Sequence, residues 1–283
     1  MGILGLDIGG TNIRMGLVEN NELKKVETSS TQNDAGEDEI INNLLDMIGK
    51  FDIKEIEGIG AGVPSVVDVE NGIVYDVQNI PSWKEVHLKR ILESRFNVPV
   101  YINNDANCFA AGEKYFGRAK PYKDIIGLII GTGLGAGVII NNRLYAGNNC
   151  GAGEFGMIPF KDRNYEYYCS GQYFSNEFGI SGKSLSEKAA GKDREALEIF
   201  KKFGANLGEA VKTIMYALDP EVIVLGGSVS KSFQFFKDEM YNTIASFSYS
   251  KSAEKIKIEV SDLNNIAVLG AAALYLDARN KTV

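Results

Sequence analysis

Two stretches of the chain repeat one pattern of apolar strand, glycine turn and apolar strand. Residues 3–23 read ILGLDIGGTNIRMGLVENNEL, and residues 125–144 read IIGLIIGTGLGAGVIINNRL. Aliphatic runs on both sides of a short glycine turn predict a β-hairpin. The period of roughly 120 residues is too long for a solenoid, so the repeat predicts two related lobes. The matching pairs include Ile3 with Ile125, Gly9 with Gly131, and, after a one-residue slip, Gly16 with Gly137 and Leu23 with Leu144.

Strands and helices alternate through the first half. The pattern predicts a third strand at 21–28, a helix over 38–50, a buried strand at 56–64, a helix over 81–96 and a strand at 98–103. The stripe of the first helix contains Ile40, Ile41, Leu44, Leu45 and Ile48. Such alternation favours an α/β fold.

The second half restarts the pattern with the second hairpin. An aromatic-rich loop is expected at 163–174, helices over 193–217 and 231–247, and a parallel-type strand at 219–230 that closes on two glycines. The segment IAVLGAAALYLDAR, 266–279, predicts a helix with a small-residue face suited to close packing. We expect residues 1–117 with the C-terminal helix, 267–283, to form a small N-terminal lobe, and residues 118–266 a larger one.

Composition narrows the location and the partners. The 283 residues carry a net charge of −7 without a long basic block, so nucleic acid is not an expected partner. No segment has the ~20 apolar residues of a membrane span, and the N-terminus does not resemble a signal sequence, so no membrane partner and a cytoplasmic location are expected. Reduced thiols are expected for the three widely spaced cysteines, Cys108, Cys150 and Cys169.

The glycine turns are candidate phosphate sites. Asp7 interrupts an apolar strand, where a buried carboxylate without a partner costs several kcal/mol, so it must meet water, a metal or a donor. Either glycine turn alone could simply close its hairpin. Two matching copies favour a clamp that grips one polyphosphate from both sides, with Asp7 holding Mg²⁺ through water. The nucleotide-binding candidates are Asp7, Gly9, Gly10, Thr11, Gly131, Thr132, Gly133, Gly226 and Gly227, the last two from a third turn that could leave room for adenine and ribose, or could be only a turn.

The order of five motifs resembles the ROK family of sugar kinases and repressors. These motifs are LGLDIGGTNIRMGLV, NNDANCFAAGE, GTGLGAGVI, GAGEFG and VIVLGGSVS, spread between about residue 3 and residue 274. The resemblance implies a two-lobed actin-like ATPase fold, related to ribonuclease H, with a central cleft. It also implies ATP and Mg²⁺ as cofactor and metal, and usually a homodimer.

The resemblance also suggests roles in sugar binding and catalysis. It implies that Asn104 holds sugar hydroxyls, that Asp105 accepts the proton from the phosphorylated hydroxyl, and that Glu154 and Asn79 contact the sugar. The residues themselves agree for Asp105, because it stands where a strand gives way to a helix, and a helix N-terminus keeps a carboxylate ionised. A plain helix N-cap is the structural alternative at this position.

The chain departs from the family where relatives bind a structural zinc through one His and three Cys. Met157 stands in place of that His, and Cys169 alone remains of the thiols. One thiolate cannot build a tetrahedral site, so no structural zinc is expected, and nearby tyrosines could hold the loop by packing. Gly171 falls where relatives place a further sugar-binding Glu, if Cys169 is aligned correctly.

We expect an ATP-dependent kinase that phosphorylates a hexose or N-acetylhexosamine. Glucose is the first candidate substrate, and the 6-hydroxyl is the first candidate position. N-acetylmannosamine, N-acetylglucosamine, fructose and allose stay open as substrates. A sugar-sensing transcriptional regulator is less expected, since only six residues precede Asp7 and leave no room for a helix-turn-helix domain. The other alternative is a non-catalytic sugar-binding or regulatory protein, against which the complete set of glycine turns argues.

Overall fold

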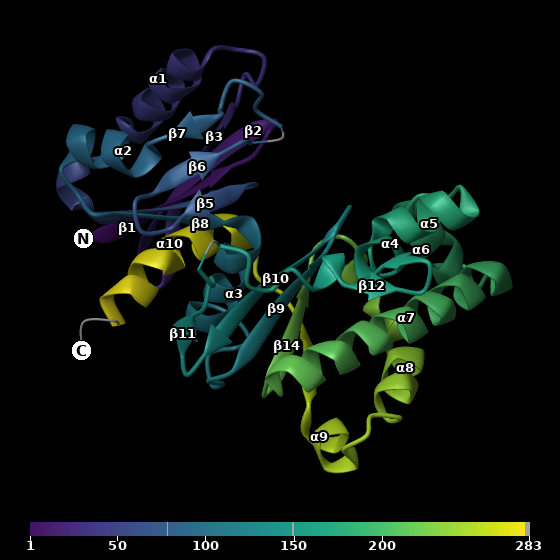
Figure 1. Cartoon of the computed structure of the whole chain (residues 1–283). Helices are drawn as coiled ribbons and strands as arrows, with labels where there is room; N and C mark the ends of the chain where they lie inside the picture. Colours follow the sequence, from purple (N-terminus) through teal and green to yellow (C-terminus); the bar gives the residue numbers. More distant parts are fainter. Residues whose placement is uncertain (78, 149, 281–283) are drawn as a thin grey trace. The chain divides into compact units, whose positions relative to one another are not determined.

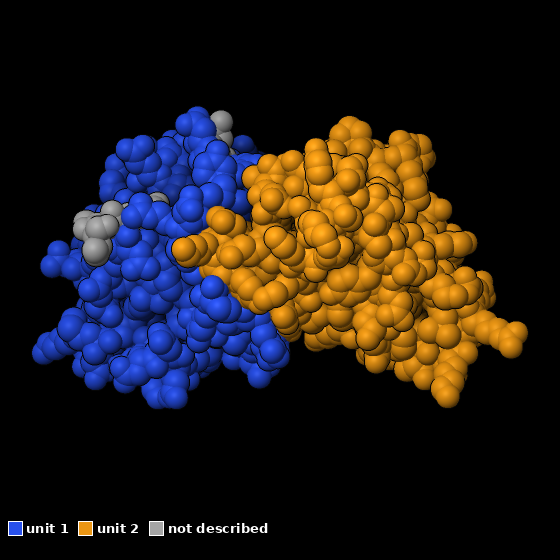
Figure 2. Space-filling model, turned by 90° about the horizontal axis from the view of Figure 1, so that it is seen from below, with its two compact units in different colours: residues 1–121, 137–152, 262–283 blue, residues 122–136, 153–261 orange. Residues whose placement is uncertain are grey.

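The computed structural model describes residues 1–77, 79–148 and 150–280. The chain forms two compact units (Figure 2). The first contains residues 1–121, 137–152 and 262–283, and the second contains 122–136 and 153–261. The expected α/β organisation with two units is therefore present. Residues 137–152 group with the first unit, whereas the lobes expected from the sequence put them in the larger one; those lobe boundaries stay a prediction.

The first unit is built on a five-stranded sheet of order β3-β2-β1-β4-β8. Its strands are β1 (Gly2–Ile8), β2 (Asn12–Glu19), β3 (Glu22–Ser30), β4 (Ile56–Val63) and β8 (Val100–Asn104). The β1–β2 and β2–β3 pairs are antiparallel, while β4 is parallel to both β1 and β8. This confirms the first hairpin and its third strand.

Helices cover both faces of this sheet (Figure 1). On one face α1 (Glu37–Ile48) and α2 (Leu88–Phe96) pack over Leu4 and Leu6, and the fully buried Trp83 belongs to the same core. On the other face α10 (Ile266–Arg279) packs over Ile3 beside α3 (Asp105–Tyr115). The period-2 alternation of a strand sends neighbouring residues to these two cores.

The approach of α10 is closer than ordinary side chains allow. A Cβ on Gly5 of β1 would overlap the carbonyl oxygen of Val268, and one on Gly60 of β4 would overlap that of Ala271. A Cβ on Gly270 would in turn overlap the carbonyl oxygen of Cys108 in α3. The small-residue face predicted for this helix is thus confirmed as a contact face.

The second five-stranded sheet has the order β11-β10-β9-β14-β15 and repeats the first. Its strands are β9 (Ile125–Ile130), β10 (Leu134–Ile140), β11 (Arg143–Leu144), β14 (Val222–Gly226) and β15 (Lys257–Val260). As in the first sheet, parallel strands follow the hairpin, because β14 is parallel to β9 and β15. The sequence repeat is therefore a structural repeat.

Residues 137–152 join the first unit through contacts with α3 and α10. Gly137 lies against the backbone of Ala106 so closely that a Cβ would overlap it, and the amide of Leu144 donates to Asp277 Oδ1 at 3.0 Å. These contacts tie the end of the second hairpin to helices of the first unit.

The second unit also contains six helices within its described residues, and α7 and α8 pack against each other (Figure 1). They are α4 (Tyr165–Cys169), α5 (Gly171–Phe178), α6 (Gly182–Ala190), α7 (Arg194–Leu218), α8 (Phe233–Ile244) and α9 (Ser250–Lys255). Short hairpins complete the fold: β5 (Val66–Asp68), β6 (Ile73–Tyr75) and β7 (Glu85–Val86) in the first unit, and β12 (Pro159–Phe160) and β13 (Arg163–Asn164) in the second.

Two predicted segments are corrected. The helix expected over 81–96 begins only at Leu88, because Val86 belongs to β7 and pairs with Val74 of β6. The loop expected at 163–174 is largely helical. Asn164 and Ser170 cap α4 and α5 there by accepting hydrogen bonds from backbone amides two or three residues later.

Candidate active site

The first glycine turn, residues 9–11, follows β1 and is held from behind. The Gly9 amide donates to the Asn12 carbonyl at 3.0 Å, and Thr31 Oγ1 donates to the Gly9 carbonyl at 2.6 Å. Thr31 is fully buried at the end of β3. Sequence reasoning missed Thr31, because a threonine after a strand carries no distinctive signal. Among the described residues, the Gly10 and Thr11 amides have no backbone acceptor, so both stay available to a ligand.

Asp7 lies next to this turn in an unfavourable electrostatic environment. Its position in β1 pairs with Arg14 in β2. Burial raises the pKa of Asp7 to about 6, the charge of Arg14 opposes this rise, and the charge of Asp105 adds to it. Asp7 and Asp105 are therefore electrostatic neighbours within the first unit.

The junction between β8 and α3 presents Asn104 and Asp105. Asn104 ends the strand and caps the helix, since its Oδ1 accepts from the Asn107 amide at 2.8 Å. Asp105 is the first residue of α3 and reaches solvent, and its Oδ1 accepts from the Ala106 amide at 2.8 Å. The helix N-terminus was expected to favour the ionised carboxylate, but desolvation by the surrounding protein outweighs it and raises the pKa of Asp105, and the Ala106 amide offsets only part of the rise. The helix N-cap is thus Asn104, which leaves Asp105 facing outward.

A buried polar network fixes this junction from the other side. Asn103 Oδ1 accepts from the Asn104 amide at 2.9 Å, from Asn107 Nδ2 at 2.9 Å and from Cys150 Sγ at 3.0 Å. The loop that contains Cys150 is thereby tied to the strand end. Sequence reasoning did not single out Asn103 or Asn107, although both lie within the motif NNDANCFAAGE that it used.

Asn79 contacts the first glycine turn directly. A Cβ on Gly10 would overlap the Cβ of Asn79. The structure therefore gathers one group of candidates within the first unit: Asp7, Gly9, Gly10, Thr11, Asn79, Asn104 and Asp105.

The second glycine turn, residues 131–133, belongs to the second unit. The Gly131 amide donates to the Gly133 carbonyl at 3.0 Å, while Thr132 is exposed. Among the described residues, the Thr132 and Gly133 amides have no backbone acceptor. Since the two turns belong to different units, the clamp across a cleft stays a prediction.

Glu154, also in the second unit, is exposed at the start of the 3₁₀ turn Phe155–Met157. The group of candidate residues in the first unit therefore does not include Glu154, and its contact with the sugar stays a prediction.

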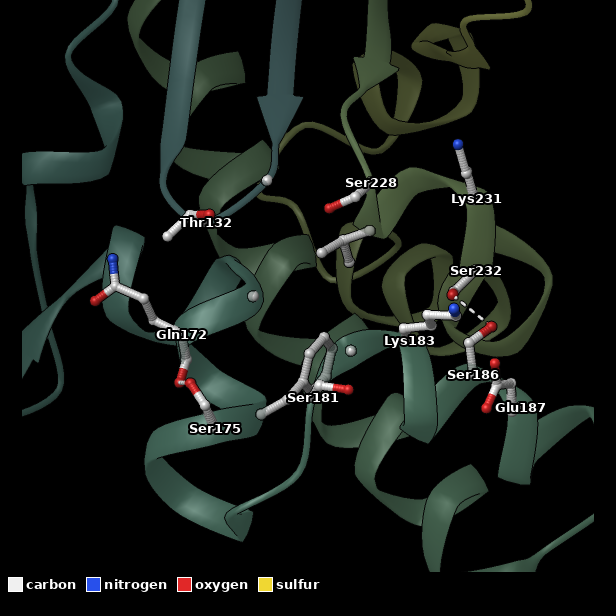
Figure 3. Close-up of a pocket in the computed structure, with 15 residues that line it drawn as sticks. Thr132, Gln172, Ser175, Ser181, Lys183, Ser186, Glu187, Ser228, Lys231 and Ser232 are labelled. Carbon is white, nitrogen blue, oxygen red and sulfur yellow. Dashed lines mark hydrogen bonds between the residues drawn. The ribbon is translucent and has the colours of Figure 1, made fainter. Parts of the chain in front are cut away.

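A cavity of about 640 Å³ opens beside the second glycine turn, entirely within the second unit (Figure 3). Gly131 and Thr132 form one part of its wall, and Ser228 and Val229 form another. The rest comes from α5, α6 and the segment before α8, and includes Gln172, Ser175, Lys183, Ser186, Glu187, Lys231 and Ser232. Ser232 Oγ donates to Ser186 Oγ at 3.0 Å in this wall (Figure 3). Sequence reasoning missed these helix residues, because their serines and lysines look like ordinary surface positions.

The third glycine turn supports this cavity from its edge. Gly227 has a φ of +86°, and a Cβ there would overlap the Ile130 carbonyl oxygen, so the turn packs directly on the end of β9. Gly226 pairs with Ile129 in the sheet. The wall itself begins at Ser228, the residue after both glycines. The nucleotide-binding role assigned to Gly226 and Gly227 stays a prediction.

The segment where the resemblance places a zinc site is packed with aromatic side chains. Met157 is 53% exposed, whereas Cys169 is fully buried and burial raises the pKa of its thiol. Across residues 1–77, 79–148 and 150–280, no group of three or more His, Cys, Asp or Glu side chains is arranged to hold a metal ion. The absence of zinc remains an expectation to be measured.

Comparison with known proteins identifies the family. The model of the ROK family matches residues 3–278, almost the whole chain. The chain belongs to the ROK family. Its α/β fold with two repeated sheets is accordingly the two-lobed, actin-like ATPase fold of ROK sugar kinases, as expected.

Relatives within the ROK family include both enzymes and regulators. The chain is 27% identical to a glucokinase of Thermotoga maritima over 96% of each chain. It is 31% identical to a xylose repressor of Bacillus subtilis, over 83% of this chain and 66% of the repressor. A crystal structure of a ROK family glucokinase from Streptomyces griseus, in complex with glucose and AMPPNP, aligns with a TM-score of 0.78 and 26% identity over 97% of this chain and 99% of that one.

Proposed function

We propose that this ROK protein is an ATP-dependent kinase that phosphorylates a hydroxyl of a hexose or N-acetylhexosamine, with the 6-hydroxyl of glucose as the first candidate. The observation that carries the proposal is the junction of Asn104 and Asp105 beside Asp7 and the first glycine turn. The relationship to the T. maritima glucokinase and the S. griseus glucokinase supports it.

In the proposed reaction Asp105 accepts the proton of the attacking sugar hydroxyl. Asp105 keeps contact with solvent, but desolvation by the surrounding protein raises the pKa of its carboxyl, which makes it a better proton acceptor than an ordinary aspartate. The transition state of phosphoryl transfer is loose, so positioning of the hydroxyl contributes more than early proton removal. Asn104, anchored by its hydrogen bond with the Asn107 amide, would hold sugar hydroxyls next to that base. Asn79 and Glu154 would complete the sugar site.

The phosphates of ATP would bind the available amides of the glycine turns. Backbone N–H groups in such turns bind anions without side chains in the way. Adenine and ribose would occupy the cavity beside Gly131 and Thr132, whose 640 Å³ lies within the usual range of small-molecule sites.

The residues near Asp7 fit a magnesium ion. Burial and the charge of Asp105 together raise the pKa of Asp7, and the charge of Arg14 offsets only part of that rise. A divalent cation held through water by Asp7 would remove this repulsion, and oxygen ligands are those that Mg²⁺ prefers. When bound, Mg²⁺ would neutralise charge on the transferred phosphate.

The decisive experiment is a panel of hexoses and N-acetylhexosamines with ATP and Mg²⁺, followed by coupled detection of ADP. We expect sugar-dependent ADP release, and phosphate on the 6-hydroxyl by NMR of the product. Asp68→Asn, which alters an exposed carboxylate bonded to Asn71 in the same unit, serves as a control and should match the wild type. Sugar binding by calorimetry without any ADP release would contradict the kinase.

That same outcome would support the second candidate, a non-catalytic sugar-binding or regulatory ROK protein. The observation in its favour is the relationship to the xylose repressor.

Two further parts of the proposal are a homodimer, testable by light scattering, and a cytoplasmic location. No helix in the described part of the chain is both long and apolar enough to span a membrane.

A further inference from the structure

The thiol of Cys150 lies inside the polar network behind the junction of β8 and α3, within the first unit. Cys150 Sγ donates to Asn103 Oδ1 at 3.0 Å, and it accepts from Asn107 Nδ2 at 3.7 Å. The Cys150 carbonyl accepts from Asn104 Nδ2 at 3.5 Å. One residue of a loop 46 positions further along the chain therefore contacts both the support of Asn104 and its side chain.

The backbone at Cys150 has a conformation that cysteine seldom adopts. Its φ is +58°, in the left-handed region where a Cβ is disfavoured. Such a conformation persists only where surrounding contacts determine it, and these positions cluster at ligand-binding sites. The hydrogen bonds with Asn103 and Asn104 supply contacts of that kind.

A thiol suits the surroundings of this side chain. Cys150 is 4% exposed and belongs to the hydrophobic core that contains Leu4, Leu6 and Trp83. A thiol packs like a small apolar group and is still a weak hydrogen-bond donor. It can therefore fill this core and donate to Asn103 at once, whereas a hydroxyl would be costlier to bury and a methyl group could not donate.

Asn103 transmits this restraint to the candidate site. The oxygen that accepts from the thiol also accepts from the Asn104 amide at 2.9 Å, directly before Asp105 begins α3. We propose that Cys150 is a positioning residue for the sugar: its thiol orients Asn103 and its carbonyl orients the Asn104 side chain, so that Asn104 and Asp105 meet the sugar hydroxyls in one fixed arrangement. The proposal rests on the function proposed above.

Two substitutions at position 150 separate positioning from packing. Cys150→Ser keeps a donor for Asn103 but buries a more polar group, so the melting temperature should fall while kcat/KM for the sugar stays within about twofold. Cys150→Ala removes the donor, so kcat/KM and the affinity for the sugar should both fall about fivefold, the equivalent of one ordinary hydrogen bond. The Kd for ATP should stay within about twofold in both variants, and the sugar used is the one that releases most ADP in the panel above.

Cys108→Ala is the matched control. Cys108 is a second buried thiol of the first unit, in α3, and its side chain makes no hydrogen bond with any residue in the described ranges 1–77, 79–148 and 150–280. Its loss should lower the melting temperature, as any lost core atom does, and leave kcat/KM for the sugar unchanged.

A coupling experiment tests whether the thiol acts through Asn103. Asn103→Leu removes the shared acceptor, so it should lower kcat/KM for the sugar at least as much as Cys150→Ala does. In the Asn103→Leu background, Cys150→Ala should then cost less than about twofold. A full fivefold loss in that background would show that the thiol does not act through Asn103.

The outcomes distinguish this inference from the proposed function. If the wild type neither binds any sugar by calorimetry nor releases ADP, the proposed function fails and this inference with it. If the wild type binds sugar without releasing ADP, the kinase fails, and the Kd values of the same variants for that sugar decide the role of Cys150.

Other results would overturn the role of Cys150 alone. One is an active wild type together with a Cys150→Ala variant whose kcat/KM for the sugar is unchanged. Another is an equal loss in Cys150→Ser and Cys150→Ala that follows their melting temperatures, since that pattern indicates a general packing defect.

Discussion

The two hairpin turns share a sequence pattern and differ in what surrounds them. The first turn, residues 9–11, packs against Asn79 and is held by the hydroxyl of Thr31. At the second turn a Cβ on Gly131 would meet no atom within 4 Å, and support comes from behind through Gly171 and Glu166. The first turn is therefore crowded at Gly10, whereas the second is crowded at Gly133 and open at Gly131.

The strands before the turns differ in a second respect. The repeat places Asp7 in the first copy opposite Ile129 in the second. Asp7 adds a charge that interacts with Asp105, whereas the second copy has an apolar residue and a cavity beside it. On the proposed function the duplicated hairpin has diverged: both copies would bind phosphate, but only the first would also hold the metal, and only the second would lie beside the adenine and ribose.

The sharpest test of the chemistry proposed beside the first copy is Asp105→Asn, at the start of α3. An amide cannot accept the hydroxyl proton, so kcat should fall by about 10² to 10⁴, the usual contribution of a general base. The Kd for ATP should change far less, because the cavity beside Gly131 is untouched. Steady-state kinetics and calorimetry check both values. Turnover near that of the wild type would remove Asp105 from the role of base.

Gly10 is crowded and Gly131 is open, so a change to valine should have different results at the two positions. Gly131→Val would project into open space where phosphate is expected, so ATP should bind at least about tenfold more weakly while the melting temperature holds. Gly10→Val must displace Asn79, so it should also raise the KM for sugar and lower stability by about 1–3 kcal/mol.

Gly36→Val is the control for this pair, because Gly36 also has no atom within 4 Å of a built Cβ but lies before α1. It should change neither ligand. If Gly131→Val binds ATP normally, the second turn does not hold phosphate.

The charge beside the first turn predicts a dependence of stability on pH. Burial raises the pKa of Asp7 from 3.8 to about 6 in the folded state, so the folded protein binds this proton more tightly than the unfolded chain. The stabilisation that protonated Asp7 gives the folded protein is fully present below pH 3.8 and is lost as pH rises through about 6. Above that pH, ionised Asp7 lowers the free energy of unfolding by at most about 3 kcal/mol.

Asp7→Asn should consequently raise the melting temperature at pH 8, without nucleotide or Mg²⁺, and the gain over the wild type should shrink towards pH 4. Thermal melts at a series of pH values measure this. The exposed Asp34→Asn should show no such trend. If Asp7→Asn melts below the wild type at pH 8, ionised Asp7 does not destabilise the folded protein.

The smallest expected effect concerns the support of the second turn. Because Cys169 alone remains of the zinc-binding thiols, a strong chelator should leave the melting temperature unchanged, and activity should return fully with Mg²⁺. Aromatic contacts, such as the stacked Phe160 and Tyr165, would stabilise this segment instead. Elemental analysis that finds one zinc per chain would refute this expectation.

Periodic segments were predictable from sequence because their burial follows one repeating rule. The final helix runs from Ile266 to Arg279 as its pattern predicts, and the first hairpin and its third strand lie where expected. Segment 81–96 misled the prediction, since Val86 was counted with the apolar stripe of Leu88 and Leu92 but pairs in a sheet with distant Val74. Local spacing cannot reveal a partner that the chain brings in from elsewhere.

The residues of the candidate site also differ in how far the sequence could predict them. Asp7 was visible because a carboxylate in an apolar strand is conspicuous, whereas Asn104 and Asp105 were named from the resemblance to ROK motifs, with the strand-to-helix junction in agreement for Asp105. Thr31 and Glu166 act through hydrogen bonds to backbone atoms 22 and 32 residues away, Gly9 and Leu134 respectively, and nothing in their local sequence marks such contacts. Supporting residues of this kind become apparent only when the turn that they hold is seen in three dimensions.

The close packing of α10 against Gly5 and Gly60 has a consequence for how the protein folds during synthesis. The first unit needs residues 262–280 to cover one face of its sheet, although the strands that form this sheet are made first. Until the ribosome has released that helix, the face around Ile3 stays exposed, and such intermediates are prone to aggregation. The second unit, complete by residue 261, can fold earlier. We therefore expect chaperone binding to nascent chains to persist until α10 has emerged.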